Sequence, residues 1–370
     1  MNAPTTPAPV GFAVVGAGYW GPNLIRNIQR CDDAELRWVC DLDRDRAARA
    51  VGRQSAVPVT DWLGTVLDDP DVTVVAVATP AHTHVGVALA CLEAGKHVIV
   101  EKPLATSVDD GRKLVEVAAR EGLVLMCDHT YCYTSAVRHI RELVAGGEVG
   151  EIQYIDSIRI NLGLVQPDVD VFWDLAPHDL SILDHVLPDD ARPVAVAAHG
   201  ADPLGTGNSC VGYLSLPLAN GGMAHVNVNW LSPTKVRTMH IGGSRRMVVW
   251  DDMNPAQRLT VHDRGVELDG ALSVEARRDT LISYRIGDMV APALPESEAL
   301  GGVISEMVAA VRERRQAATS GESGLWVLEV LDAVGRSLDR GGALVPLPPR
   351  RPTPATLSSR PTADLAQEAP

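Results

Sequence analysis

The chain has 370 residues, of which 46% are hydrophobic and 22% charged, so it is long enough for two globular domains. Its formal net charge is −14, which argues against nucleic acid or an anionic membrane as a partner. No apolar run has the length of a transmembrane helix, and residues 1–10 lack the features of a signal peptide. We therefore expect a cytoplasmic protein in which residues 1–10 form a flexible arm.

The first predicted elements are a strand, a tight turn and a helix within residues 12–28, FAVVGAGYWGPNLIRNI. The turn carries the pattern G-x-G-x-x-G. In this pattern Gly16 makes the turn, Gly18 lets a pyrophosphate approach the backbone, and Gly21 lets helix and strand pack closely. The next apolar run ends in Asp41, where a dinucleotide site places a carboxylate for the ribose hydroxyls. The alternative is a glycine turn in another α/β protein, with Asp41 as a helix cap.

Strand and helix patterns alternate through residues 11–128, which predicts a doubly wound parallel sheet. The predicted strands are 12–15, 36–40, 57–59, 72–78, 97–100 and 123–127, and the predicted helices that follow the first are 44–51, 61–67, 84–93 and 108–121. Ligands of such a sheet lie beyond the carboxyl ends of its strands. The polar or glycine residues that follow strands here are Gly16, Asp41, Thr79, Glu101 and Lys102, with Pro80 beside them.

Residues 129–345 predict a second, α+β domain with a mainly antiparallel sheet. Its predicted helices are 135–145, 173–187, 298–314 and 325–340, and its predicted strands are 152–161, 193–198, 210–216, 222–231, 236–241, 247–250 and 258–262. Residues 225–230 alternate strictly, so one face of that strand is polar without full charges and suits either a subunit interface or a substrate floor. Residues 346–370 are rich in Pro, Ser and Ala, and we expect a disordered tail.

No metal site is predicted. None of the six cysteines lies in a C-x-x-C pair, and several fall in apolar strand-like runs, as reduced core cysteines do. Cys127 and Cys132 flank His129, which raises a metal or redox site as an alternative. The chain has no second ligand pair with structural zinc spacing to complete it.

Two groups of residues carry candidate chemistry. In Glu101-Lys102-Pro103 the lysine ends a strand, where its ammonium can hold a substrate hydroxyl and stabilise the alkoxide that develops; the alternative is a surface lysine in a salt bridge. Asp174 and His178 are four residues apart and share one face of a predicted helix. A histidine suits proton transfer at neutral pH, and the carboxylate can orient its ring. The alternatives are a core or capping histidine and an aspartate that caps the helix.

Taken together, these motifs resemble the Gfo/Idh/MocA oxidoreductases from about residue 11 to residue 345. The matching features are the glycine turn, Thr79-Pro80 with His82 and His84, Glu101-Lys102-Pro103, the Asp174 and His178 helix, and the run Gly321-Glu322-Ser323-Gly324-Leu325 before the last helix. The resemblance implies an N-terminal Rossmann domain, a C-terminal α/β domain with a large open sheet, and dimers or tetramers formed through that sheet. It also implies NAD or NADP as cofactor.

The resemblance assigns roles to residues of this chain. The catalytic lysine, aspartate and histidine of the family fall on Lys102, Asp174 and His178. Cofactor contacts are expected from Gly16, Gly18, Tyr19, Trp20, Gly21, Asp41, Thr79, Pro80, His82, His84, Glu101 and Lys102. Two departures, Ala176 where many members have glycine and Ser181 where many have an acid, concern the residues that support the histidine. The run WDLAPHDLSI looks most like the branch that acts on sugar nucleotides.

We therefore expect reversible oxidation of a secondary alcohol, at C3 of a nucleotide-linked hexose or N-acetylhexosamine. Asp41 is followed by Leu42 rather than a basic residue, which favours NAD because the carboxylate repels a 2′-phosphate; Arg44 weakens this preference. Substrate contacts are expected from Lys102, Tyr131, Asn161, Asp174, His178 and Lys235, with His225 as a further polar candidate, and contacts to a phosphate from Arg159, Lys235 and Arg237. Two alternatives remain, a dehydrogenase of a free cyclitol, aminocyclitol or aminoglycoside sugar, and a non-catalytic NAD-binding regulator.

Overall fold

The computed structural model describes residues 7–52, 55–163, 165, 169–267, 283–350 and 356–357. These residues divide into two compact units. The first contains the described residues within Met1–Tyr133, Glu298–Leu328 and Arg350–Pro370, and the second contains those within Thr134–Ser297 and Glu329–Pro349.

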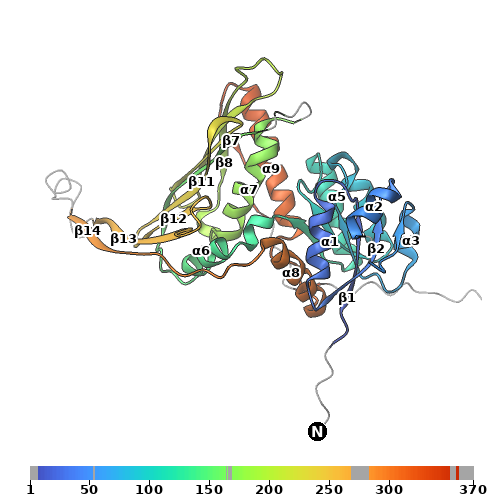
Figure 1. Cartoon of the computed structure of the whole chain (residues 1–370). Helices are drawn as coiled ribbons and strands as arrows, with labels where there is room; N and C mark the ends of the chain where they lie inside the picture. Colours follow the sequence, from blue (N-terminus) through green and yellow to red (C-terminus); the bar gives the residue numbers. More distant parts are fainter. Residues whose placement is uncertain are drawn as a thin grey trace, which may run out of the picture. The chain divides into compact units, whose positions relative to one another are not determined.

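A six-stranded parallel sheet forms the centre of the first unit, in the order β3-β2-β1-β4-β5-β6. Figure 1 labels β1 and β2 of this sheet and several of the helices beside it. Its strands are β1 (Val10–Val15), β2 (Ala34–Cys40), β3 (Val59–Thr60), β4 (Val74–Val77), β5 (His97–Glu101) and β6 (Leu125–Asp128). They alternate with α1 (Gly21–Gln29), α2 (Arg44–Val51), α3 (Leu63–Asp68), α4 (His84–Glu93) and α5 (Val108–Glu121), and the 3₁₀ turns η1 (Ala81–Thr83) and η2 (Thr130–Tyr133) follow β4 and β6. Every residue of β1 and β4 is buried, as in strands covered on both faces. The predicted doubly wound sheet is confirmed.

The direction of the strand order changes between β1 and β4. From β1 the chain moves outward to β2 and β3, then returns to place β4 on the other side of β1. Such a switch point leaves a crevice at the carboxyl ends of the two strands, and ligands of open α/β sheets bind there. The glycine turn follows β1 and Thr79-Pro80 follows β4, so both lie at this edge.

Helix α8 (Ala299–Glu313) belongs to the first unit, whereas the sequence had placed it in the second domain. Glu298, immediately before α8, accepts a hydrogen bond of 2.9 Å from Asn27 Nδ2 of α1 and pairs with the guanidinium of Arg26. This contact joins residues far apart in the sequence, so no local pattern predicts it. The last helix, α9 (Gly321–Asp339), contains the division between the units, after Leu328.

The second unit is built on a nine-stranded sheet in the order β14-β13-β12-β11-β7-β10-β9-β8-β15. Its strands are β7 (Ile152–Leu162), β8 (Ala195–Ala201), β9 (Val211–Pro217), β10 (Met223–Asn229), β11 (Leu231–Gly243), β12 (Met247–Asp251), β13 (Leu259–Glu267), β14 (Ser283–Val290) and β15 (Val345–Pro346). The one parallel pair among these described strands is β7 with β10. The predicted mainly antiparallel sheet is confirmed, and β14 and β15 were not predicted.

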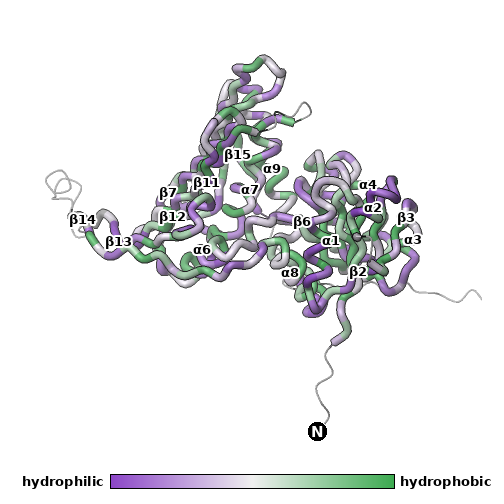
Figure 2. Tube along the Cα trace, in the orientation of Figure 1, coloured by the Kyte–Doolittle hydropathy of each residue, from purple (hydrophilic) through white to green (hydrophobic). Residues whose placement is uncertain are grey.

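Helices cover one face of this sheet. Helix α7 (Val171–Val186) packs on β7, β9 and β10 and against α6 (Ser135–Ala145), and Figure 1 shows it running along the strands. Buried and exposed side chains alternate along the strands accordingly: Val226 and Val228 of β10 are buried, whereas His225, which precedes them, is exposed. Figure 2 shows polar and apolar residues interspersed along β7 and β11 in the same way.

Parts of the predicted arm and tail belong to the folded units. Val10 begins β1, and the backbone oxygen of Ala8 accepts a hydrogen bond of 3.2 Å from Arg312, so these two residues do not belong to a flexible arm. β15 pairs with β8 in antiparallel fashion, so the predicted tail begins inside a strand. Residues 1–6, 351–355 and 358–370 lie outside the described part of the chain. Among the described helices, none combines the length and the apolar character needed to cross a membrane.

Candidate active site

The glycine turn has the shape that a pyrophosphate site requires. Gly16 has φ +97°, and a Cβ there would lie 2.5 Å from the backbone oxygen of Ala78. A Cβ on Gly21 would lie 2.1 Å from the backbone oxygen of Gly16, so helix and turn approach too closely for any side chain. Among the described residues, a Cβ on Gly18 would meet nothing within 4 Å. Open space therefore lies beside Gly18, next to the first turn of α1, which has no cap from a described side chain. These residues fit a dinucleotide.

Asp41 directly follows β2 and is 7% exposed. Its Oδ2 accepts the backbone N–H of Ala17 at 2.7 Å, and its Oδ1 accepts the backbone N–H of Asp43 at 2.8 Å. Arg46 of α2 closes on the same carboxylate, with Nη2 2.6 Å from Oδ1 and Nε 3.1 Å from Oδ2. Burial opposes ionisation, but the hydrogen bonds from Arg46, Ala17 and Asp43 outweigh it and lower the pKa of Asp41. Sequence reasoning missed Arg46, whose only signal was a basic residue early in the following helix.

The two aromatic residues of the turn differ in environment. Tyr19 is 95% exposed. Trp20 donates from Nε1 to Oδ2 of Asp128, at 3.3 Å, and so links the glycine turn to the end of β6. Asp128 also accepts a hydrogen bond of 2.8 Å from the hydroxyl of Thr130. Burial raises the pKa of Asp128 to about 6, against the opposing effect of these two hydrogen bonds.

The loop after β4 is joined to the loop after β5 by His84. Its ring is 1% exposed, with Nδ1 2.8 Å from the backbone oxygen of Pro103 and Nε2 2.8 Å from that of Thr79. Both ring nitrogens therefore face backbone carbonyls, and the imidazole is not placed for the direct cofactor contact that the resemblance implied. We assign it instead to holding the two loops together. His82, on η1, and Pro80 are exposed.

Two carboxyl groups lie side by side at the end of the sheet next to Lys102. Glu101 of β5 and Asp128 of β6 are register partners, and the backbone N–H of Lys102 donates to the carboxylate of Glu101. Burial, together with the neighbouring Asp128, raises the pKa of Glu101 well above its usual range. The Lys102 side chain is partly exposed, and the peptide bond from Lys102 to Pro103 is cis. Lys102 therefore directly follows β5, next to the two carboxyl groups of Glu101 and Asp128.

Helix α7 carries the second group of predicted residues. It begins two residues earlier than predicted, because the carboxylate of Asp170 accepts the backbone N–H of Trp173 at 2.9 Å and caps the helix. Pro177 therefore lies inside the helix rather than in its first turn. Proline has no N–H to donate to the carbonyl four residues earlier, that of Trp173, so the helix ladder is interrupted between Asp174 and His178.

Asp174 is held by a buried tryptophan. The indole Nε1 of Trp230, a residue 1% exposed, donates to Asp174 Oδ2 at 2.9 Å. Trp230 directly follows β10, so the sheet on which α7 packs fixes the carboxylate. His178 follows one helical turn later and is partly exposed. Sequence reasoning placed Asp174 and His178 on one helix face but did not identify Trp230 as their support.

A buried ion pair fixes α7 on β7. Arg159 and Asp179 are 2% and 1% exposed, with Nε 2.7 Å from Oδ2 and Nη2 3.1 Å from Oδ1. The hydroxyl of Ser157 donates to Asp179 Oδ1 at 2.9 Å. The expectation that Arg159 meets a substrate phosphate is therefore wrong, because its guanidinium is buried against α7. Arg237 lies 3.5 Å from Asp252 and is partly exposed.

The other predicted substrate residues are dispersed. Tyr131, expected in the second domain, lies on η2 in the first unit. Asn161 is on β7 and partly exposed, and Lys235 is exposed on β11. Within the first unit the structure brings together the glycine turn, Asp41 and the ends of β4, β5 and β6. Within the second it brings together Asp174 and His178. The meeting of Lys102 with this pair remains a prediction.

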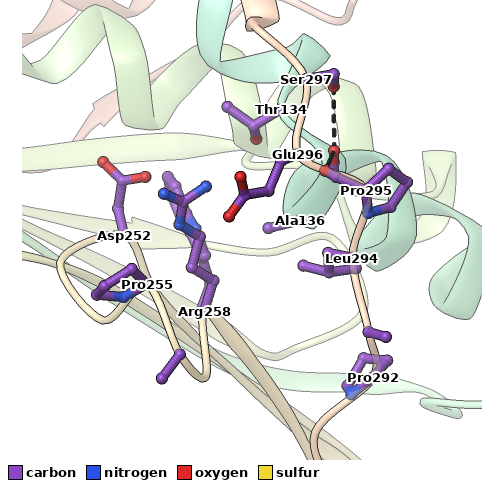
Figure 3. Close-up of a pocket in the computed structure, with 14 residues that line it drawn as sticks. Thr134, Ala136, Asp252, Pro255, Arg258, Pro292, Leu294, Pro295, Glu296 and Ser297 are labelled. Carbon is purple, nitrogen blue, oxygen red and sulfur yellow. Dashed lines mark hydrogen bonds between the residues drawn. The ribbon is translucent and has the colours of Figure 1, made fainter.

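A cavity of about 230 Å³ also lies in the second unit, between residues 292–297 and the start of α6. Figure 3 shows Arg258 pointing between the carboxylates of Asp252 and Glu296. Neither Asp174 nor His178 lines this cavity. It is therefore separate from the predicted catalytic pair.

Comparison with known proteins agrees with this arrangement. Residues 10–129 match the model of the oxidoreductase family with an NAD-binding Rossmann fold, GFO_IDH_MocA, and residues 137–249 match the GFO/IDH/MocA C-terminal domain. An uncharacterised oxidoreductase of Streptococcus pneumoniae is 31% identical over 160 residues, 43% of each chain, and inositol 2-dehydrogenase 3 of Saccharopolyspora erythraea is 32% identical over 185 residues, 49% of this chain and 54% of that protein. These alignments thus cover about half the length of the relatives.

Among solved structures, the UDP-N-acetylglucosamine 3-dehydrogenase GnnA of Acidithiobacillus ferrooxidans superposes with a TM-score of 0.75, over 88% of this chain and 96% of that one, at 24% identity. At this identity the likeness shows the fold. The two family models, by contrast, match both predicted domains in the predicted order. We conclude that the chain belongs to the Gfo/Idh/MocA family of oxidoreductases and has an NAD-binding Rossmann domain.

Proposed function

We propose that this protein is a sugar dehydrogenase that oxidises, reversibly, a secondary ring alcohol with NAD. The observation that carries the proposal is on α7, where buried Trp230 fixes the carboxylate of Asp174 one turn before a partly exposed histidine, His178. An oriented carboxylate beside an imidazole is the arrangement of a general base. A non-catalytic NAD-binding regulator needs no such base.

Each of the three residues has its own role in the proposed reaction. His178 accepts the hydroxyl proton of the substrate, and Asp174 orients the imidazole and favours its protonated form. Lys102 holds the same oxygen and stabilises its negative charge. A bound nicotinamide supplies the hydride acceptor. Because the two residues of α7 belong to a different unit from Lys102, the proposal requires these three side chains to converge during turnover.

The dinucleotide is expected at the switch point of the first unit. The open space beside Gly18 and the uncapped start of α1 suit its pyrophosphate, and Asp41 suits the adenosine ribose. The charge of Asp41 favours NAD over NADP.

For the substrate we propose a nucleotide-linked hexose or N-acetylhexosamine, oxidised at C3. The run WDLAPHDLSI and the shared fold with a UDP-N-acetylglucosamine 3-dehydrogenase support this choice. Tyr131, Asn161 and Lys235 are the proposed contacts to the sugar and its phosphates. A free cyclitol or aminocyclitol is the second candidate, supported by the partial match to an inositol dehydrogenase.

We also propose that the protein forms a dimer or tetramer through the uncovered face of the nine-stranded sheet. His225 and Asp156 point to this face, where the imidazole lies 3.3 Å from the carboxylate, and exposed Met223 of β10 and exposed Tyr213 of β9 lie on the same face. This face is opposite the one that α7 covers. The polar side of β10 therefore suits a subunit interface better than a substrate floor.

The test is a panel of nucleotide sugars, free sugars and cyclitols, monitored by NADH absorbance, with wild-type protein and Lys102→Ala. We expect turnover on a nucleotide sugar and its loss in the variant, with NADH still bound. Binding of NADH without turnover on any alcohol would support the regulator instead. Normal turnover by Lys102→Ala would show that the role given to Lys102 is wrong.

A further inference from the structure

The carboxylate expected to bind the adenosine ribose, that of Asp41, is already bound by groups of the protein itself. The Asp41 carboxylate accepts two backbone N–H groups, of Ala17 and Asp43, and a two-pronged contact from the Arg46 guanidinium. Two carboxylate oxygens offer about four acceptor sites. These contacts use them, so a ribose hydroxyl can donate to Asp41 only if one of the present donors leaves.

The three donors differ in how easily they move. The N–H groups of Ala17 and Asp43 are parts of the backbone, at the glycine turn and at the cap of α2. Arg46 is a long side chain with 46% of its surface exposed, so it can turn outward without disturbing α2. Arg46 is therefore the donor that yields.

We propose that Arg46 is the residue that sets the choice between NAD and NADP, by leaving Asp41 when NAD binds or staying on Asp41 and meeting the 2′-phosphate when NADP binds. This inference rests on the proposed function, because it assumes a dinucleotide in the glycine turn. When Arg46 swings away, Asp41 accepts the ribose hydroxyls of NAD. When Arg46 stays, its charge offsets that of Asp41, and its outer N–H groups can bind a 2′-phosphate.

The inference modifies the preference for NAD drawn from the sequence. That preference assumed a bare carboxylate that repels the 2′-phosphate, with Arg44 as its only basic neighbour. The structure instead places Arg46 on the carboxylate, whereas Arg44 lies 3.5 Å from the backbone oxygen of Val59. We therefore expect a modest NAD preference with measurable NADPH binding.

The test is to measure dissociation constants of NADH and NADPH by the quenching of protein tryptophan fluorescence, without substrate. Arg46→Ala should weaken NADPH binding at least about tenfold and leave NADH binding equal or tighter. Asp41→Asn should shift the preference the other way, toward NADPH. Arg44→Ala, on the same helix but not on Asp41, is the matched control and should leave the ratio of the two constants unchanged.

The outcomes separate the two proposals. If wild-type protein binds neither dinucleotide, the proposed function fails. If it binds NADH but Arg46→Ala changes both constants equally or not at all, the inference about Arg46 is overturned and the proposed function stands. A ratio that changes in Arg44→Ala but not in Arg46→Ala would likewise overturn it. Melting temperatures of all variants identify any that fail to fold. If Arg46→Ala fails to fold, Asp41→Asn still tests the proposal through the expected shift of preference toward NADPH.

Discussion

Replacing Asp179 with asparagine should destabilise the second unit strongly, because it removes the carboxylate charge that pairs with the buried guanidinium of Arg159. Arg159 and Asp179 are 2% and 1% exposed, and two guanidinium nitrogens contact the carboxylate at 2.7 and 3.1 Å. Breaking a buried pair by removing one partner costs about 3–5 kcal/mol. At about 2–4 °C per kcal/mol for a unit of this size, the melting temperature should fall by roughly 6–20 °C.

The structure offers a matched control for this variant. Asp332 pairs with Arg336 at 3.0 Å on α9, and both side chains are about half exposed. Asp332→Asn removes the same kind of charge and should cost no more than about 0.5 kcal/mol. The double variant Arg159→Met, Asp179→Leu should recover much of the loss, because apolar residues of similar volume satisfy the site without a buried charge.

The assay is urea unfolding of the four proteins, followed by circular dichroism, with turnover measured on folded protein. Since Asp179 directly follows His178 on α7, we expect Asp179→Asn to lower turnover more than the double variant does. Equal stabilities of Asp179→Asn and Asp332→Asn would refute the claim that this ion pair fixes α7 on the sheet.

Three further predictions concern stability and the candidate site. Burial raises the pKa of Asp128 to about 6, so the native state binds this proton more tightly than the unfolded chain does, and the free energy of unfolding falls as pH rises from about 4 to 6. In urea unfolding, Asp128→Asn should reduce this dependence on pH and add about 1–3 kcal/mol to the free energy of unfolding at pH 7. An unchanged dependence on pH would contradict the prediction. Trp230→Phe removes the donor to Asp174 and should lower kcat about tenfold with NADH affinity unchanged, whereas an unchanged kcat would count against it. Gly18→Ala should weaken NADH binding at an unchanged melting temperature, whereas Gly21→Ala, whose Cβ would lie 2.1 Å from a backbone oxygen, should also lower the melting temperature; the same melting temperature for both would oppose this reading.

Elements whose ends are set by local chemistry were predictable from the sequence. Helix α5 begins where Ser107 accepts the backbone N–H of Asp110 and ends where Gly122 takes a φ of 64°. Both signals lie within the helix and its immediate flanks, and the predicted bounds match. The start of α7 was predicted two residues too late, at Trp173, whereas the actual cap is Asp170, whose carboxylate accepts the backbone N–H of Trp173.

The residues of the candidate site were predictable from the sequence, but their partners were not. The glycine turn, Asp41, Lys102 and the pair on α7 stand in short motifs, so the residue pattern indicates them. The partners that set their chemistry come from distant segments: Trp230 meets Asp174 across 56 positions of the chain, and Trp20 meets Asp128 across 108. Only the fold brings such residues together.

The central claim is that Lys102 and His178, from two different units, act on one substrate oxygen. The most direct measurement is a double-mutant cycle in kcat with Lys102→Ala, His178→Asn and the combined variant, on the best substrate of the panel and with NADH affinity checked for each. Residues that act together lose activity non-additively, so we predict a combined variant little worse than the poorer single one. Fully additive losses, or normal turnover in either single variant, would contradict the account.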